Sequence, residues 1–536
     1  MSGSNADLVI KNGNIITVDR TRPKAQALAI KFGHIVAVGA NEDIEPLTGT
    51  GTRVINASGQ TIIPGLNDAH CHVLWAGHSH FLLDCGPDVV SSLKEIKRLI
   101  ADKARQTPRG EWIIGYGYDD TKMEEDWFLN RHDLDEAAPE HPVWIRHVAG
   151  HMSTTNSTGL ARAGLTREAV DPVGGRYGRD PSTGELDGVI YETAQGQFTQ
   201  GPGSIISGTA QGDDQEAIKW ACQSAASLGL TSFTDASVDS TGFQAYQKAH
   251  INGNLSIRTY MLPAVEFLDT LIDSGIRTRF GDEMLRVGAI KIIGDGAIAG
   301  RTAYLSTPYE GTTDDYGILA IAPDVLEERI ITAHRAGFQV AVHANGDRII
   351  NMTLDAYRKA LELYPRENHR HRLEHGTVVT PEILTRMKQL GIAVLPFGSY
   401  IYYHAEKMRF YGPERLSMMF AHRSFLDNGI VVGGSSDHLC APWPPLAGIQ
   451  SCVTRKGHTG ELLGPEQRVT PEEALWIYTM GSAQTSFEEN IKGSIEPGKL
   501  ADIVFLGADL SQVAPETIKD IPVLATMVGG EFVYQT

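Results

Sequence analysis

The sequence predicts an α/β protein built on a (β/α)8 barrel, with a small β domain formed by both ends of the chain and a large insertion after the first barrel strand. Three observations lead to this prediction. Strand-like and helix-like runs alternate through the middle of the chain, short strand-like runs dominate both ends, and one long stretch interrupts the alternation. A chain of 536 residues is long enough for one large domain with accessories.

Both ends of the chain are rich in short strands. Residues 7–18 alternate in polarity around Asn12-Gly13, a dipeptide typical of hairpin turns, and residues 525–534 predict a terminal hairpin. We therefore expect residues 1–63 and 490–536 to share one small β domain.

The middle of the chain, residues 64–489, predicts the barrel. It carries eight apolar runs of strand length, the first of which ends at His70. Amphipathic stretches such as 327–336 and 381–390 separate several of these runs and predict helices on a parallel sheet. The seven later runs cover residues 229–234, 255–262, 286–293, 337–343, 371–375, 392–395 and 429–433.

Residues 76–225 do not follow this repeat. The stretch is rich in Asp, Arg, Gly and Pro, and it contains aromatic clusters at residues 112–118 and 127–128. Because it directly follows the first barrel strand, we expect a separately folded insertion that covers the mouth of the active site.

Composition narrows the class of protein. A net charge of −18 argues against nucleic acid or an anionic membrane as the main partner. The five cysteines are widely spaced and suit the reduced thiols of a cytoplasmic protein. We expect no secretory leader, because the first residues lack a basic stretch followed by an apolar one, and no membrane span, because no run approaches about 18 apolar residues. We expect a cytoplasmic protein with a small-molecule substrate, and a homodimer remains open.

The stretch from Pro64 to His72 ends the first barrel strand with two histidines, His70 and His72. Alternate side chains of a strand share one face, so both imidazoles point the same way. Two adjacent imidazoles are suited to a transition metal, although the pair alone does not choose between zinc, iron, nickel and copper. Two ordinary polar residues at a strand end are the alternative.

Four further polar side chains occur within or at the end of separate apolar runs. Each has an ordinary alternative on its own: a lysine at a strand end, a core histidine or a turn aspartate. Since the carboxyl ends of barrel strands face one common site, the six residues together predict a metal centre. The four are Lys291, His343, His375 and Asp437.

Six sequence motifs resemble the metal-dependent amidohydrolase superfamily, in the branch that contains N-substituted formamide deformylase. The resemblance covers nearly the whole chain; it is specific for fold and chemistry and loose for the substrate. The motifs are Pro-Gly-Leu-Asn-Asp-Ala-His-Cys-His from Pro64, the strand lysine Lys291, Val-His-Ala-Asn-Gly-Asp from Val342, Glu374-His375-Gly376, Ser435-Ser436-Asp437, and Pro-Gly-Lys-Leu-Ala-Asp-Ile-Val from Pro497.

The resemblance implies a composite β-sandwich from both termini and a centre for one or two divalent ions, with zinc expected. It places His70 and His72 on a first metal and His343 and His375 on a second. Lys291 would bridge the two ions as a carbamate. Asp437 would bind the first ion and act as the general base.

Further side chains in loops or in the insertion are candidates for the substrate pocket, with surface or packing roles equally open for each. They are Trp75, Tyr118, Asp119, His147, His151, Arg301 and Tyr304.

These observations predict a metal-dependent hydrolase that cleaves an amide-type C–N bond, such as that of an N-substituted formamide or an N-acyl compound. A cyclic amide, an ester or an amino-substituted ring at the same site is one alternative. A catalytically silent barrel that binds a small molecule is another, but such a receptor has no need of the complete set of metal ligands.

Overall fold

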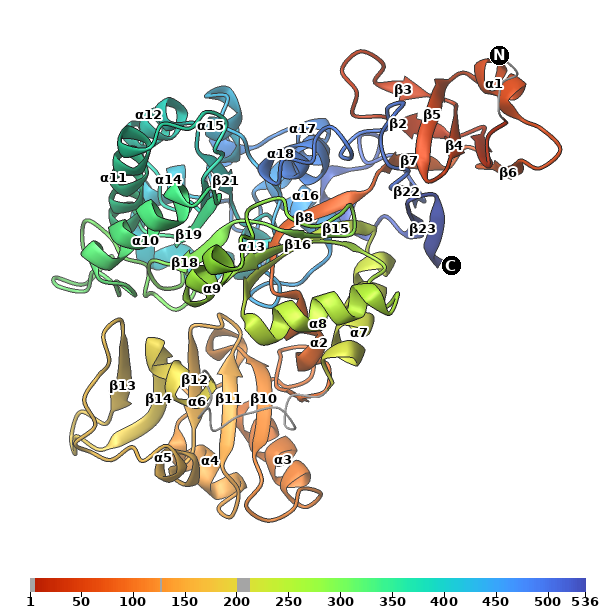
Figure 1. Ribbon diagram of the computed structural model, residues 1–536. Coiled ribbons are helices and arrows are strands. Elements are labelled where there is room, and N and C mark those ends of the chain that lie inside the picture. Colours follow the sequence, from red (N-terminus) through yellow and green to blue (C-terminus); the bar gives the residue numbers. More distant parts are fainter. Residues whose placement is uncertain (1–4, 126–127, 200–212) are drawn as a thin grey trace.

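The computed structural model describes residues 5–125, 128–199 and 213–536 of the 536-residue chain (Figure 1). Trp127 of the predicted aromatic cluster, residues 200–212 of the predicted insertion and the first four residues lie outside the described parts. The described strands form five sheets. Two of these sheets lie in the middle of the chain, one combines strands from both ends, one consists of N-terminal strands alone, and one belongs to the stretch in which the insertion is predicted.

Two four-stranded sheets of parallel strands form the centre of the molecule. Helices flank them, as expected for βα units (Figure 1). One sheet contains β8 (Leu66–Cys71), β15 (Leu230–Val238), β16 (Arg258–Pro263) and β17 (Leu285–Val287); the other contains β18 (Ile290–Ile293), β19 (Val340–Ala344), β20 (Arg372–His375) and β21 (Ala393–Leu395). The associated helices include α2 (Val73–Ser79), α7 (Asp214–Ser227), α8 (Ser240–Ile251), α9 (Leu268–Asp273), α10 (Pro323–Arg335), α11 (Asp347–Leu363) and α12 (Pro381–Leu390).

The predicted strand 286–293 is two strands in different sheets, because the chain changes partners at Gly288. The Gly288 N–H donates to the Met261 carbonyl at 2.7 Å, and a Cβ at this glycine would lie 2.3 Å from the Tyr260 ring. Only a glycine therefore allows β17 to leave β16 while β18 pairs with β19. A single bridge between Ala264 and Lys291 connects the two sheets at this edge.

The eighth predicted strand, residues 429–433, is not regular. This stretch forms only isolated bridges, such as Val394 with Val432, because the Gly434 N–H donates to the Ile477 carbonyl at 3.1 Å. On its other side, Gly434 accepts the Ala69 N–H at 2.8 Å. The stretch therefore contacts both outer strands, β21 and β8, and the strand pairing shows an α/β fold of two parallel sheets.

The two ends of the chain meet in one six-stranded sheet, in which β22 pairs antiparallel with β7. A second, four-stranded sheet packs against it through a shared core that includes Ile10, Leu28, Ile62 and Phe505. The first sheet contains β2 (Asn14–Ile16), β3 (Lys24–Ala25), β7 (Thr61–Pro64), β22 (Ile503–Leu506), β23 (Val523–Val528) and β24 (Glu531–Gln535); the second contains β1 (Leu8–Lys11), β4 (Ala27–Lys31), β5 (His34–Gly39) and β6 (Arg53–Asn56).

One predicted hairpin is confirmed and the other is wrong. β23 and β24 form a hairpin through Gly529 and Gly530, both of which have the positive φ that such turns require. Asn12 also has a positive φ, of 55°. However, the strands on either side of the Asn12-Gly13 turn belong to different sheets, because β1 pairs with β4 and β6 while β2 pairs with β3 and β7.

The fifth sheet forms a separate layer below the centre in Figure 1. Its core includes Ile96, Tyr118 and Leu134, whereas α7, which follows it, packs into the central core through Ile218 and Cys222. The sheet contains β9 (Leu83–Asp84), β10 (Ile113–Tyr118), β11 (Val143–His147), β12 (Met152–Thr155), β13 (Gly175–Arg179) and β14 (Leu186–Glu192), with helices α3 (Leu93–Ala104), α4 (Arg131–Ala137) and α5 (Ser157–Arg162).

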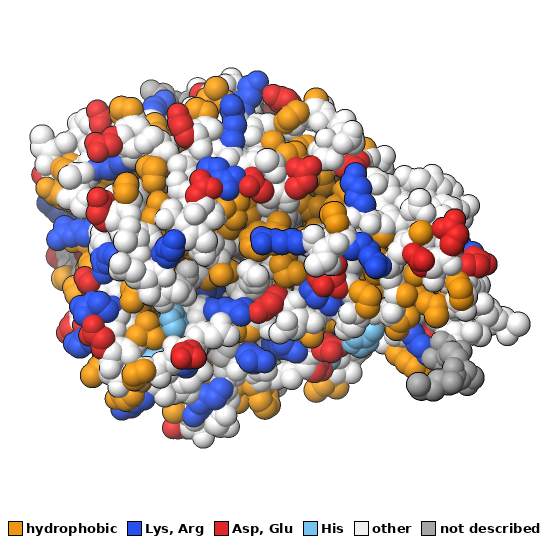
Figure 2. All heavy atoms as spheres, turned by 90° about the horizontal axis from the view of Figure 1, so that it is seen from above, with side chains coloured by type: hydrophobic (Ala, Val, Ile, Leu, Met, Phe, Trp, Pro, Cys, Tyr) orange, Lys and Arg blue, Asp and Glu red, His pale blue; other side chains and the backbone are white. Residues whose placement is uncertain are grey.

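The surface carries charges of both signs. On the face shown in Figure 2, acidic and basic side chains are interspersed, with hydrophobic groups between them. Within the described residues, every helix is too short or too polar to cross a membrane.

Candidate metal centre

The first two candidate ligands lie at the end of β8 and directly after it. His70 lies near the end of the strand and is fully buried, and His72 lies at the start of α2. His70 Nδ1 contacts the Glu374 carboxylate, and His72 Nδ1 donates to the Ala236 carbonyl at 3.1 Å. A partner on Nδ1 fixes the tautomer and leaves Nε2 free to bind a metal. Both Nε2 atoms face Asp437.

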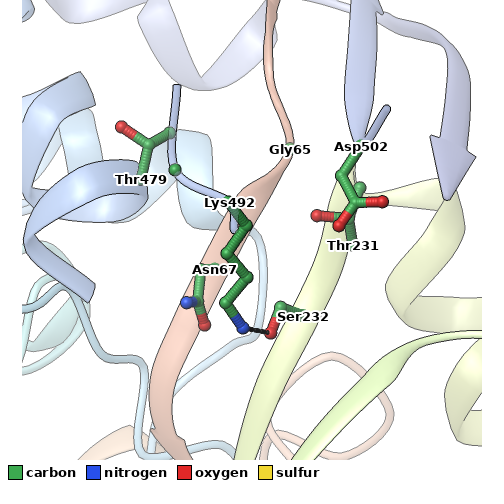
Figure 3. Close-up of a pocket in the computed structure, with 8 residues that line it drawn as sticks. Gly65, Asn67, Thr231, Ser232, Thr479, Lys492 and Asp502 are labelled. Carbon is green, nitrogen blue, oxygen red and sulfur yellow. Dashed lines mark hydrogen bonds between the residues drawn. The ribbon is translucent and has the colours of Figure 1, made fainter. Parts of the chain in front are cut away.

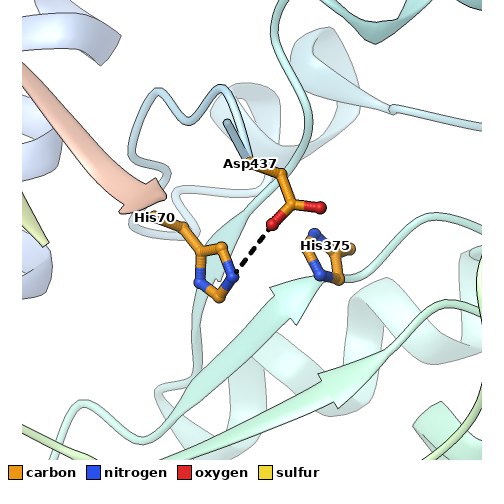
Figure 4. Close-up of side chains that lie close together, drawn as sticks. All are labelled: His70, His375 and Asp437. Carbon is orange, nitrogen blue, oxygen red and sulfur yellow. Dashed lines mark ion pairs between the residues drawn. The ribbon is translucent and has the colours of Figure 1, made fainter. Parts of the chain in front are cut away.

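Asp437 lies in the loop after residues 430–436 and comes close to His70 (Figure 4) and to His72. Its Oδ1 atom lies 3.3 Å from His70 Nε2 and 3.3 Å from His72 Nε2, yet it has no hydrogen-bond partner of acceptable geometry among the residues that the structure describes. Ligand atoms around a tetrahedral zinc ion, at about 2.0–2.1 Å from it, lie about 3.3–3.4 Å apart. The distance from Oδ1 to each imidazole nitrogen therefore suits ligands that share an ion.

β19 and β20 contribute two further imidazoles. His375 Nε2 lies 3.1 Å from His343 Nδ1, and the His375 ring stacks on Phe397 with a centroid distance of 4.1 Å. His375 Nδ1 is buried and has no hydrogen-bond partner in the described parts of the chain. Ligand atoms of His70, His375 and Asp437 all lie within 4.8 Å of one another.

Lys291, on β18, is the remaining predicted ligand. Its side chain is 2% exposed, and its Nζ atom lies 3.5 Å from His70 Nε2. Lys291 forms no ion pair with any residue that the structure describes. Burial lowers its pKa to about 8, which raises the fraction of neutral amine at neutral pH.

The surroundings of the cluster favour the protonation states in which its side chains can bind a metal. Burial lowers the pKa of His72, His343 and His375, so their imidazoles are neutral at pH 7. Burial alone would raise the pKa of Asp437, but the surrounding imidazoles, His375 first, hold it well below its usual range. Neutral imidazoles and an ionised carboxylate are the forms that bind a divalent ion.

The donor set therefore fits a divalent metal. It consists of buried imidazoles and one carboxylate, which suit zinc and other transition ions. The unpartnered Asp437 Oδ1 and His375 Nδ1 support the same conclusion, because buried polar atoms without partners are rare in native proteins.

Two of the predicted pocket residues lie beside the ligands. Trp75 stacks on the His72 ring at a centroid distance of 4.9 Å. His151, in the β11–β12 turn, has its ring 5.0 Å from that of His343, and its Nδ1 atom pairs with Glu192 at 2.6 Å.

The other predicted pocket residues have different surroundings. Tyr118 belongs to the core of the fifth sheet, and its hydroxyl accepts the Leu129 N–H. Asp119 forms a buried ion pair with Lys407 at 2.8 Å. The exposed Arg301 packs over the Phe410 ring.

Tyr304 and His147 complete the predicted set. The Tyr304 N–H donates to Asp295, a carboxylate 3.6 Å from His343 Nε2. His147 Nε2 pairs with Asp120 at 3.0 Å, on the side of the fifth sheet.

Sequence reasoning missed the buried charges that hold the ligands. Arg372 makes two hydrogen bonds to Glu374, at 2.7 and 2.9 Å, and Glu374 contacts His70. Asp68 accepts the Ser436 N–H at 3.1 Å and the Trp443 indole N–H at 3.1 Å. Asp68 lies two residues before His70, on the same face of the strand, and this spacing is the signal that could have identified it.

A narrow crevice lies at the opposite end of β8 from His70 (Figure 3). It is lined by residues that include Gly65, Asn67 and Asp502, and Lys492 reaches across it to the Ser232 hydroxyl. Lys492 also pairs with Glu488 at 2.6 Å. Because its own side chains fill this crevice, we assign it a structural role.

An α/β fold with imidazoles and one carboxylate gathered at strand ends defines the class of metal-dependent hydrolases. Residues 53–534 match the model of the Amidohydrolase family, and the chain belongs to that family. It is 30% identical to "Putative amidohydrolase YtcJ" of Bacillus subtilis, over 98% of both chains. It is 28% identical to N-substituted formamide deformylase of Arthrobacter pascens, over 99% of this chain and 98% of that protein.

A solved structure shows the same fold. An uncharacterized metal-dependent hydrolase from Pyrococcus horikoshii superposes with a TM-score of 0.77, covering 95% of this chain and 99% of that chain at 24% identity.

Proposed function

We propose that this protein hydrolyses an amide-type C–N bond of a small molecule, with N-substituted formamides and N-acyl compounds as the substrate class. The observation that carries the proposal is the convergence of His70, His72 and His375 on Asp437, whose Oδ1 atom is buried without a hydrogen bond to any described residue. Similarity to N-substituted formamide deformylase over nearly the whole chain supports the choice of bond.

His70, His72 and Asp437 would hold a divalent ion, with zinc as the expected metal, and His343 and His375 would hold a second. When bound, such an ion lowers the pKa of water and polarises a carbonyl oxygen.

Asp437 is the proton carrier in this proposal. Its carboxylate is ionised, since its pKa lies well below the usual range, and it is fixed by contacts with two imidazoles. It can accept a proton from the attacking water and deliver it to the leaving amine nitrogen. Asp68 and Ser436 hold the preceding backbone and so position the carboxylate.

Lys291 would carry a carbamate. Its neutral amine attacks carbon dioxide, a C–N bond forms and one proton leaves, so that the product is an anion with two oxygens. Burial supports this step by lowering the pKa of the amine. The anion would also supply the negative charge that the cluster of imidazoles lacks.

The proposed architecture is an eight-stranded barrel. Residues 430–437 hydrogen-bond to both β21 and β8, which supports their role as the eighth strand that joins the two sheets. The fifth sheet would cover the mouth, because its residue His151 lies beside His343.

The test is a screen of metal-defined enzyme against formamides, N-acyl amino acids, lactams and esters. Apo-protein should be inactive, and zinc should restore turnover of formamides or N-acyl compounds in preference to lactams and esters. A preference for lactams or esters would reassign the substrate class. The absence of turnover with any metal and any substrate would favour a silent binding protein.

A further inference from the structure

Arg146 is a partly buried cation that has no anionic partner among the described residues. It lies on β11, and its guanidinium donates to the Gly150 carbonyl at 3.3 Å. It forms no ion pair with any residue in the described parts of the chain. Its neighbour Tyr116 does not supply an anion, because burial raises the pKa of the Tyr116 phenol. Partial burial removes some of the hydration of this charge, and none of the described acidic side chains replaces it.

The position of Arg146 connects it to the metal centre. Its Cζ atom lies 3.9 Å from the centroid of the Trp75 ring, and Trp75 stacks on His72. Arg146, Trp75 and His72 line one small pocket between the fifth sheet and the loop that follows Asp437. The guanidinium is therefore separated from a candidate metal ligand by a single indole ring.

Neighbouring groups fix the position of the guanidinium, and part of Arg146 remains accessible. Register pairs Arg146 on β11 with Tyr116 on β10, so the two side chains share one face of the sheet, and the Tyr116 hydroxyl donates to the Leu439 carbonyl at 3.4 Å. Arg146 itself is only partly buried. Stacking on Trp75 orients the plane of the guanidinium, and its free N–H groups are suited to two parallel hydrogen bonds with a carboxylate.

We propose that Arg146 binds a carboxylate group of the substrate, so that the favoured substrates are amides that bear a carboxylate close to the scissile C–N bond. This inference rests on the proposed amide hydrolysis and narrows its substrate class. It also answers an electrostatic requirement, because a protein with a net charge of −18 repels anions unless a local cation attracts them.

Stacking on Trp75 gives Arg146 a second, purely structural explanation. A cation–π contact would tie the fifth sheet to α2 and would be worth about 0.5–2 kcal/mol. Loss of such a clamp would disturb all substrates equally, whereas loss of a carboxylate partner would disturb only those that carry the charge. The two roles therefore separate in substrate preference.

The experiment uses zinc-loaded, full-length enzyme and two matched substrates: an N-acyl amino acid, and the same compound with its carboxylate capped as a methyl ester. Release of the acyl acid gives kcat/KM for each. The wild type should prefer the free carboxylate, and Arg146→Met should lower the ratio of the two kcat/KM values about 100-fold. Arg146→Lys keeps the positive charge but loses the paired N–H groups of the guanidinium. Its ratio of kcat/KM values should therefore lie between those of the wild type and Arg146→Met.

Arg109→Met is the matched control, because Arg109 is an exposed arginine that pairs with Glu140 outside this pocket. It should leave the ratio of the wild type unchanged. Equal use of both substrates by the wild type, or an equal loss on both in Arg146→Met, would overturn the role of Arg146 while leaving amide hydrolysis intact. The absence of turnover of every amide would remove the proposed function, and the inference with it.

Discussion

Asp437 shows how much of the candidate centre depends on one backbone position. Its φ of 53° lies in the left-handed region, which a residue other than glycine seldom adopts. Its N–H donates to the His70 carbonyl at 2.9 Å, and Asp68 holds the Ser436 N–H just before it. His375 has a similar φ, of 74°. Two candidate ligands thus sit on strained backbone that their surroundings fix, as is common at functional sites.

Asp437→Asn should keep the fold and lose turnover. The amide is nearly isosteric with the carboxylate but cannot accept the proton, so kcat should fall by about 10²–10⁴-fold. Steady-state kinetics at saturating zinc, with circular dichroism and metal analysis, would measure this. Asp427→Asn, at an exposed ion pair with Arg423, is the control and should behave like the wild type. Near-normal turnover in metal-loaded Asp437→Asn would assign the base elsewhere.

Lys291→Ala should lose both bound metal and activity, because it removes the amine that would carry the carbamate. Short carboxylates such as acetate should partly restore both by filling the vacated space. Metal analysis and activity across a titration of acetate would measure the rescue. Lys291→Met, which fills that space, should not be rescued. Full metal content in Lys291→Ala without any additive would contradict the carbamate.

At the scale of elements, a buried ion pair ties the fifth sheet to the segment η6 (Ala405–Tyr411). Asp119, at the end of β10, pairs with Lys407, and both side chains are 2% exposed. Burial alone would raise the pKa of Asp119, but the Lys407 ammonium lowers it below its usual range. Removing one partner of such a pair destabilises the protein more than replacing both partners, because the remaining charge stays buried without compensation.

Lys407→Met should therefore destabilise the protein by about 3–5 kcal/mol. The double variant Asp119→Asn, Lys407→Met should recover much of this loss. Urea unfolding would measure the free energies. Lys97→Met breaks an exposed pair with Glu136 in the same layer, and it should cost no more than about 1 kcal/mol. If the double variant is no more stable than Lys407→Met, electrostatics do not explain the loss.

The sequence predicted elements better than it predicted their partners. The ends of β8, β19 and β20 carried recognisable ligands, since a polar residue that ends an apolar run is visible locally. The turn at Asn12 was correct as a turn but wrong as a hairpin, because β1 and β2 satisfy their hydrogen bonds with strands far along the chain.

Arg146 and Glu374 were missed for the same physical reason. A strand with an internal charge suggests a role only when the surroundings of that charge are known. Those surroundings come from segments that lie far away in sequence, such as His70 for Glu374 and Trp75 for Arg146. Local pattern therefore identified the candidate ligands but not the group that orients His70 or the arginine proposed to bind the substrate.

At the scale of the whole molecule, buried neutral histidines outside the candidate centre should govern acid stability. Burial lowers the pKa of His369 to about 4 and that of His422 to about 3. An unfolded histidine, with a pKa of about 6.5, binds a proton at pH 5 that the folded form does not bind. The contribution of these histidines to the free energy of unfolding is therefore fully present above about pH 6.5. It is lost as the pH falls toward their pKa values in the folded protein.

The free energy of unfolding should fall between pH 7 and pH 5, by about 2 kcal/mol for each fully buried imidazole. His422→Gln should make this dependence shallower by that amount, because glutamine does not take up a proton. Urea midpoints across the pH range would measure the slopes. His132→Gln, at an exposed position, should leave the slope unchanged. An identical slope in His422→Gln would show that other groups control acid unfolding.

The six-stranded sheet also has a consequence for biosynthesis. β7 is synthesised early, but its neighbour β22 begins about 440 residues later, at Ile503. Because translation proceeds at about 5–20 residues per second, the edge of β7 stays unpaired for roughly 20 to 90 s before β22 is synthesised. Throughout that interval Ile62 and Ile63, which lie on opposite faces of β7, have no cover from the later strands. Production in cells will therefore depend on chaperones that shield a nascent strand, and the yield should rise when translation of the central segment is fast.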